Sequence, residues 1–71
     1  MLKPILYTID GCVECLQARK HLLTANIEFR EKNFLKDRKS ATEVFTLVGE
    51  VIAPVFVDGG KIVKGLDICH L

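Results

Sequence analysis

The sequence predicts an α/β fold in which one mixed four-stranded sheet carries helices on both faces. Apolar residues recur at helical spacing in 12–24 and again in 40–48. Short β-branched or alternating runs stand before, between and after these segments, and a glycine pair separates the last two runs, as in a hairpin. The predicted strands are 5–9, 27–31, 55–57 and 61–63. The order β-α-β-α-β-β lets the first two strands pair in parallel across a helix and closes with an antiparallel hairpin.

The first strand is the apolar run from Ile5 to Ile9, and Asp10-Gly11 ends it in a tight turn. A helix then begins at Cys12 or Val13 and runs to Thr24. Its apolar positions at helical spacing are Val13, Cys15, Leu16, Ala18, Leu22 and Leu23, and we expect them to face the core. We expect the polar side chains of this helix to be solvated, including Arg19, Lys20 and His21.

The second strand and second helix follow the break at Asn26. Residues 27–31 alternate apolar and polar side chains with period two, which predicts a strand with one buried face. Ser40 and Glu43 have the spacing of a capping box, so the helix is expected to start there. Gly49 is the expected C-terminal stop.

The last part of the chain reads as a hairpin followed by a short helix. Pro54 can open a strand but cannot sit inside one, so the third strand starts just after it. The turn falls at 58–60, and Gly65 ends the return strand. Residues 66–71 have room for only a short last helix.

Size and charge narrow the classes of function. A chain of 71 residues predicts a single domain, 1–71, with one site. A net charge of +1 does not predict binding to nucleic acid or to an anionic membrane. The sequence has neither a secretory signal nor a spanning apolar run, so we expect a cytoplasmic protein that binds no membrane. We also expect it to be a monomer.

The chemistry is predicted to lie in the pair Cys12 and Cys15. Three cysteines are an odd number, which is untypical of a secreted disulfide scaffold. The amides and partial positive charge of a helix start favour a thiolate on Cys12, which would attack a disulfide, and Cys15 would resolve the product. Asp10 and Glu14 oppose that effect in part, which predicts a reducing couple nearer to thioredoxin than to the oxidising DsbA type.

Other uses of the cysteines stay open at this point. A zinc site would need ligands from Cys69, His70 or His21, and no second paired motif is present. A bridge from Cys12 to Cys69 would close a long loop and contribute about 4 kcal/mol. For Cys69 itself we expect a buried position on a helix face, and the alternative is a third thiol with a redox or metal-linked role.

Several segments together resemble a glutaredoxin-type member of the thioredoxin superfamily. They are Tyr7-Thr8, Cys12-Val-Glu-Cys15, Val51-Ile-Ala-Pro54-Val-Phe-Val, Gly59-Gly60 and Lys64-Gly65-Leu-Asp67. The resemblance implies a thioredoxin-like fold, a cis peptide between Ala53 and Pro54, and an Ala53 backbone that pairs with extended substrate. The ending at 64–67 is closer to the redoxins that reduce ribonucleotide reductase. The implied substrate-binding residues are Gly11, Val13, Ala53, Pro54, Gly65, Leu66 and Asp67.

The sequence departs from glutathione-using glutaredoxins. Ile9 replaces their usual lysine, and Val13-Glu14 replaces their Pro-Tyr pair, so two contacts for glutathione are missing. Asp67 could still meet the amino group of glutathione. Both thioredoxin reductase and the glutathione system therefore remain candidate electron sources, and no bound cofactor or metal is expected.

These observations predict a thiol–disulfide oxidoreductase that reduces protein or low-molecular-weight disulfides through Cys12 and Cys15. The alternative is a thiol module that binds a metal or, with glutathione, an iron–sulfur cluster. The spacing Cys12-Val-Glu-Cys15 fits that alternative poorly, because cluster-holding members often have a single active-site cysteine.

Overall fold

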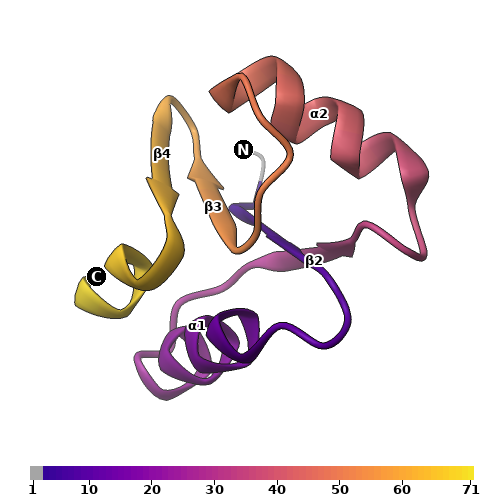
Figure 1. The fold of residues 1–71 in the computed structure, drawn as a ribbon. Coiled ribbons are helices and arrows are strands. Elements are labelled where there is room, and N and C mark those ends of the chain that lie inside the picture. The colour runs from indigo at the N-terminus through magenta and orange to yellow at the C-terminus, as the bar shows by residue number, and fades with distance from the viewer. Residues whose placement is uncertain (1–2) are drawn as a thin grey trace.

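The computed structural model describes residues 3–71 and has seven elements. In chain order they are β1 (Ile5–Thr8), α1 (Val13–Thr24), β2 (Arg30–Asn33), α2 (Arg38–Val48), β3 (Val55–Asp58), β4 (Lys61–Lys64) and the 3-10 helix η1 (Gly65–His70). The strands form one mixed sheet in the order β2-β1-β3-β4 (Figure 1). β1 pairs with β2 in parallel, and the other two pairings are antiparallel. The predicted mixed four-stranded sheet is therefore confirmed.

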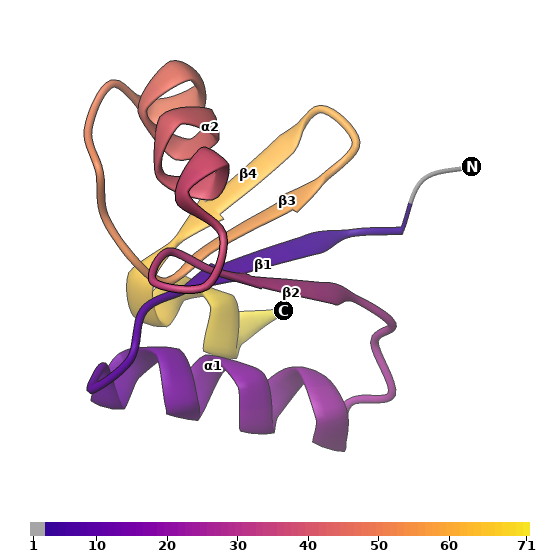
Figure 2. The ribbon, with the colours of Figure 1, turned by 90° about the vertical axis from the view of Figure 1, so that its right-hand side faces the viewer.

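Helices cover both faces of this sheet, as predicted. Figure 2 shows α2 on one side and α1, together with η1, on the other. Each face has its own cluster of buried side chains. The cluster under α1 and η1 contains Leu6, Ala18, Leu22, Phe56 and Ile68. The cluster under α2 contains Tyr7, Phe34, Val44 and Val55. Successive residues of β1 alternate between the two clusters because side chains of a strand point to opposite faces.

Helix α1 starts where the sequence predicts, but fewer of its residues are buried than predicted. Cys15, Ala18 and Leu22 are buried. Val13, Leu16 and Leu23 are 69%, 59% and 63% exposed, so the prediction that they face the core is wrong. A helix that lies on a sheet buries only one stripe of its residues. In α1 that stripe consists of Cys15, Ala18 and Leu22.

The second strand lies three residues later than predicted at its start. Residues 27–29 belong to no strand, and Ile27 N–H donates to the Leu22 carbonyl at 2.9 Å, just after the end of α1. The parallel pairing begins only where Arg30 N–H donates to the Pro4 carbonyl at 2.7 Å. Ile27 and Phe29 still pack against the core on the α1 side, so their alternation reflects burial and not strand pairing.

The capping box predicted at Ser40 is wrong. Helix α2 begins at Arg38, and its N-cap is Asp37, whose side chain accepts a hydrogen bond from Lys39 N–H at 3.1 Å. Ser40 is buried inside the first turn, and its hydroxyl donates to the Asp37 carbonyl. Glu43 does not reach back to the cap but bonds to Tyr7 and Lys32. Gly49 ends the helix with φ of 81°, as predicted.

We expect Asp37→Ala to lower the free energy of unfolding by about 0.5–2 kcal/mol, because the amides of the first α2 turn lose their side-chain acceptor. Asp37→Asn keeps an acceptor at the same place and is the matched control. Urea unfolding followed by circular dichroism measures both. Equal losses for the two variants would mean that the charge of Asp37, and not its capping bond, stabilises α2.

The end of the chain folds as predicted. β3 and β4 form a hairpin around Gly59-Gly60, and η1 follows at Gly65. β2 and β4 are the two edges of the sheet. The predicted domain covers residues 1–71. Residues 1 and 2, where a secretory signal would begin, lie outside the described residues. Within 3–71, no helix combines the length and apolar character needed to cross a membrane.

Candidate dithiol site

Cys12 lies at the start of α1, in the turn that follows β1. It is the N-cap residue, and its Sγ accepts a hydrogen bond from Cys15 N–H at 3.1 Å. Gly11 precedes it with φ of 79°, a conformation that L side chains rarely adopt. The Cys12 side chain is half-buried. A sulfur atom that is partly open to solvent therefore sits on the free amides of a helix start.

Cys15 lies one turn further along and is only 2% exposed. Burial raises the pKa of its thiol to about 12, and the neighbouring Cys12 adds to this through a hydrogen bond and its charge. A backbone hydrogen bond with Ile9 and the positive charge of Arg19 act in the opposite direction. Cys12 is half-buried and Cys15 is buried, so the two residues differ in access to solvent.

Both cysteines line one open pocket of about 340 Å³. Its lining residues are Ile9, Asp10, Gly11, Cys12, Val13, Cys15, Leu16 and Arg19. Ile9, Val13 and Leu16 give the pocket an exposed apolar rim. On its acidic side, the Asp10 carboxylate accepts a hydrogen bond from the side-chain amide of Asn33 at 2.8 Å.

Arg19 also lines this pocket. Its side chain is 37% exposed, so it is a surface charge as predicted, but one that is held in an ion pair. Its Nε donates to Glu31 Oε1 at 2.6 Å, and a second guanidinium nitrogen donates to Oε2. Glu31 Oε2 also accepts from the hydroxyl of Thr8, which is fully buried. Sequence reasoning missed this chain of contacts, although Arg19 lies four residues after Cys15, the spacing that places two side chains on one helix face.

The predicted substrate-binding residues of the second half of the chain lie at the same end of the sheet as the cysteines. β1 runs toward Cys12 and pairs antiparallel with β3, so the start of β3 lies beside the end of β1 (Figure 2). The Pro54 carbonyl accepts a hydrogen bond from Gly65 N–H at 2.9 Å, which joins the start of β3 to η1. The Ala53-Pro54 peptide is cis, as predicted.

The cysteine pocket does not include this second group. Pro54 is buried, Ala53 and Gly65 are half-buried, and Leu66 and Asp67 are exposed. Of the predicted substrate-binding residues, only Gly11 and Val13 line the pocket with the thiols. The binding roles of all seven stay predictions.

The remaining candidate ligands do not gather around the dithiol. Cys69 lies on η1 and is half-buried, so the expected full burial is wrong. His21 is not simply solvated, because its Nε2 lies 2.9 Å from the Leu71 carbonyl oxygen. Among residues 3–71, no three His, Cys, Asp or Glu side chains form a group that could hold a metal ion.

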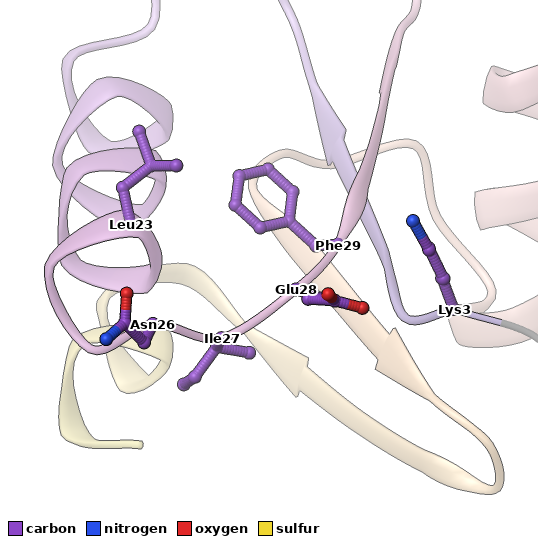
Figure 3. A pocket seen from close by; sticks show the side chains of 6 residues that line it. All are labelled: Lys3, Leu23, Asn26, Ile27, Glu28 and Phe29. Carbon is purple, nitrogen blue, oxygen red and sulfur yellow. The ribbon is translucent and has the colours of Figure 1, made fainter.

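A larger open pocket of about 540 Å³ lies at the C-terminal end of α1, and no cysteine lines it. Figure 3 shows Leu23 and Asn26 on the helix side, Ile27, Glu28 and Phe29 on the segment that leads to β2, and Lys3 across from them. It contains no thiol and no grouped catalytic side chains. The chemistry of the chain therefore points to the smaller pocket at the cysteines.

The sheet order, the two helical layers and the dithiol at the start of α1 define the glutaredoxin-like form of the thioredoxin fold. Solved structures with this fold are similar over most of their length. Glutaredoxin (grx-1) from Archaeoglobus fulgidus has a TM-score of 0.82 and 24% identity, covering 92% of this chain and 76% of that one. Glutaredoxin from Brucella melitensis gives 0.75 and 27%, covering 99% and 76%.

The glutaredoxin-like NrdH-redoxin from Escherichia coli, described as having a thioredoxin-like activity profile, is similar over still more of its chain. Its TM-score is 0.79 at 20% identity, covering 99% of this chain and 95% of that one. No protein-family model matches the sequence, and a search of curated protein sequences gives no match. The expected thioredoxin-like fold is thus confirmed by structure and not by close sequence relatives.

Alkylation is expected to separate the two thiols. In a Cys69→Ser variant at neutral pH, iodoacetamide should modify Cys12 and leave Cys15 thiol intact, because Cys15 is buried and its pKa is raised to about 12. Peptide mass spectrometry after timed quenching measures the two sites. Modification of both cysteines at equal rates in the folded protein would contradict this difference, and denaturation in urea is the control that should equalise them.

Proposed function

We propose that this protein is a thiol–disulfide oxidoreductase that reduces disulfides with Cys12 and Cys15. The observation that carries the proposal is the pair of thiols at the start of α1. Cys12 is half-buried and lines an open pocket, and its Sγ accepts a hydrogen bond from Cys15 N–H, while Cys15 is buried one turn behind it. The glutaredoxin and NrdH-redoxin folds among the similar structures support this reading.

The proposed reaction has two exchange steps. The Cys12 thiolate attacks one sulfur of a substrate disulfide, the substrate S–S bond breaks, and the departing sulfur leaves as a thiolate that takes up a proton. Cys15 then loses its proton and attacks Cys12 Sγ, which expels the second substrate sulfur as a thiolate. The substrate gains two electrons and two protons, and the protein is left with a Cys12–Cys15 disulfide that a separate reductase must restore.

Protein disulfides are the proposed substrate class. The rim of Ile9, Val13 and Leu16 around the thiols offers exposed apolar contact. Ala53, at the same end of the sheet, is proposed to pair through its backbone with an extended stretch of the substrate. Gly65, Leu66 and Asp67 would extend this surface from η1. We place this activity in the cytoplasm, where thiols are kept reduced.

Thioredoxin reductase is the reductant we favour over glutathione. Ile9 and Glu14 lie where the resemblance places a lysine and an aromatic residue that contact glutathione, so those two contacts are missing. Asp67 is exposed and is the remaining candidate contact for the glutathione amino group. The glutathione system would need this contact to compensate for both replacements.

NADPH consumption with insulin as the disulfide substrate tests the proposal. One assay contains thioredoxin reductase, and the other contains glutathione with glutathione reductase. Turnover with thioredoxin reductase is expected, and turnover only with glutathione would overturn the choice of reductant. Turnover no higher than that of Cys12→Ser in both assays would overturn the oxidoreductase function. The cluster alternative then predicts a brown protein after anaerobic purification with glutathione.

A further inference from the structure

Arg19 is the charged side chain of α1 that lies in the dithiol pocket. It sits one helical turn after Cys15 and lines the same open pocket as both cysteines. Its side chain is 37% exposed, so it is neither buried in the core nor free in solution. Neither of the two proposed exchange steps assigns a role to Arg19.

Two hydrogen bonds hold the Arg19 guanidinium, and a third holds the residue that accepts them. Glu31 on β2 accepts two hydrogen bonds from the guanidinium, a geometry that orients an arginine more strongly than a single contact does. Glu31 is itself held by the hydroxyl of Thr8, which donates to Oε2 at 2.9 Å. Because Thr8 is fully buried in β1, the contacts tie the guanidinium to the sheet and not only to its own helix.

A nearby cation would stabilise the thiolate form of Cys15. Its sulfur must become an anion before it can attack, and burial opposes that anion. The charge of Arg19 acts on Cys15 in the favourable direction. Asp10 and Glu31 also lie near the guanidinium, and their negative charges oppose its field at Cys15.

We propose that Arg19 is a positioning residue for the second exchange step, in which its oriented guanidinium favours the Cys15 thiolate that attacks Cys12. This inference rests on the proposed oxidoreductase function. In that step the Cys15 proton goes to solvent, a bond forms between Cys15 Sγ and Cys12 Sγ, and the Cys12–substrate S–S bond breaks. The substrate sulfur leaves with the bonding electron pair.

The two exchange steps can be measured separately with 5,5′-dithiobis(2-nitrobenzoate), a small aromatic disulfide. In a Cys69→Ser background, attack by Cys12 releases one coloured thiolate, and resolution by Cys15 releases a second. Stopped-flow absorbance on the reduced protein follows both phases. The first phase reports the proposed function, and the second reports the role of Arg19.

Arg19→Gln is expected to slow the second phase by about threefold to tenfold, since a partly exposed charge shifts a thiol equilibrium by up to about one pKa unit. The first phase should keep the rate of the parent protein. Arg19→Lys retains the charge but not the two-nitrogen contact with Glu31, and it should recover part of the second-phase rate. Lys20→Gln removes the same charge from the next, exposed position of α1 and should change neither phase.

Other outcomes decide against the inference. An unchanged second phase in Arg19→Gln, or an equal slowing of both phases, would overturn it, because the second pattern is that of a general disturbance of α1. Failure of Arg19→Lys to recover any of the rate would also overturn it, since the charge would then not be the acting feature. Absence of a fast first phase in the parent protein would instead remove the proposed function itself.

Discussion

Replacing Cys12 with serine is expected to lower the rate of insulin reduction by roughly a thousandfold or more. Serine has nearly the shape of cysteine, but its hydroxyl does not ionise near neutral pH and cannot form a disulfide. The hydroxyl oxygen can still accept the hydrogen bond from Cys15 N–H, so the start of α1 should remain capped. The loss should therefore appear in turnover and not in the folded structure.

Two further variants give this prediction its controls. Cys15→Ser should still attack through Cys12 but stop at the mixed disulfide, which mass spectrometry detects as an adduct of the substrate mass. Cys69→Ser should keep the parent turnover, because Cys69 lies on η1 and outside the dithiol pocket. Residual activity of Cys12→Ser close to that of the parent would show that another group attacks the substrate.

Shortening Ile68 to alanine is expected to lower the free energy of unfolding by about 2–4 kcal/mol. Ile68 is fully buried in the cluster under α1, together with Leu6, Ala18 and Leu22. Removing its side chain leaves a cavity between η1 and the sheet. At about 0.05–0.15 kcal/mol per residue, a chain of this length has roughly 4–11 kcal/mol in total, so the loss is a large part of it.

Urea unfolding monitored by far-ultraviolet circular dichroism measures this change. Leu66→Ala is the matched control, because Leu66 lies on the same short helix and is 46% exposed, so its truncation should cost less than about 0.5 kcal/mol. Similar losses for the two variants would mean that η1 is not anchored through Ile68. A stable Ile68→Ala protein would show that the core under α1 does not depend on η1.

Much of the fold follows from local patterns in the sequence. Gly49 and Gly65 adopt positive φ where the helix and the hairpin end, and Gly59-Gly60 forms the hairpin turn, because glycine accepts such backbone angles freely. Pro54 predicts a strand that begins just after it, and β3 begins there, at Val55. These features depend on neighbouring residues alone, which is why sequence reasoning finds them.

The predictions from sequence are wrong where contacts between distant parts of the chain determine the local structure. The start of β2 is set by the bond from Arg30 to the Pro4 carbonyl, more than twenty residues away. Glu43 has the spacing of a capping-box residue, yet it bonds to Tyr7 on β1 and Lys32 on β2. Arg19 likewise finds Glu31 only once α1 lies on the sheet. Spacing in the sequence cannot show which of several available partners a side chain will take.

The charged ends of the edge strand β4 bear on self-association. If two copies joined their β4 edges in the antiparallel register that pairs the whole strand, Lys61 of each copy would stand opposite Lys64 of the other. Like charges directly opposite one another destabilise such a pairing, and lysine on an exposed edge is a known guard against it. The lysines of β4 therefore repel a second copy at this edge of the sheet. We expect sedimentation equilibrium to find single chains.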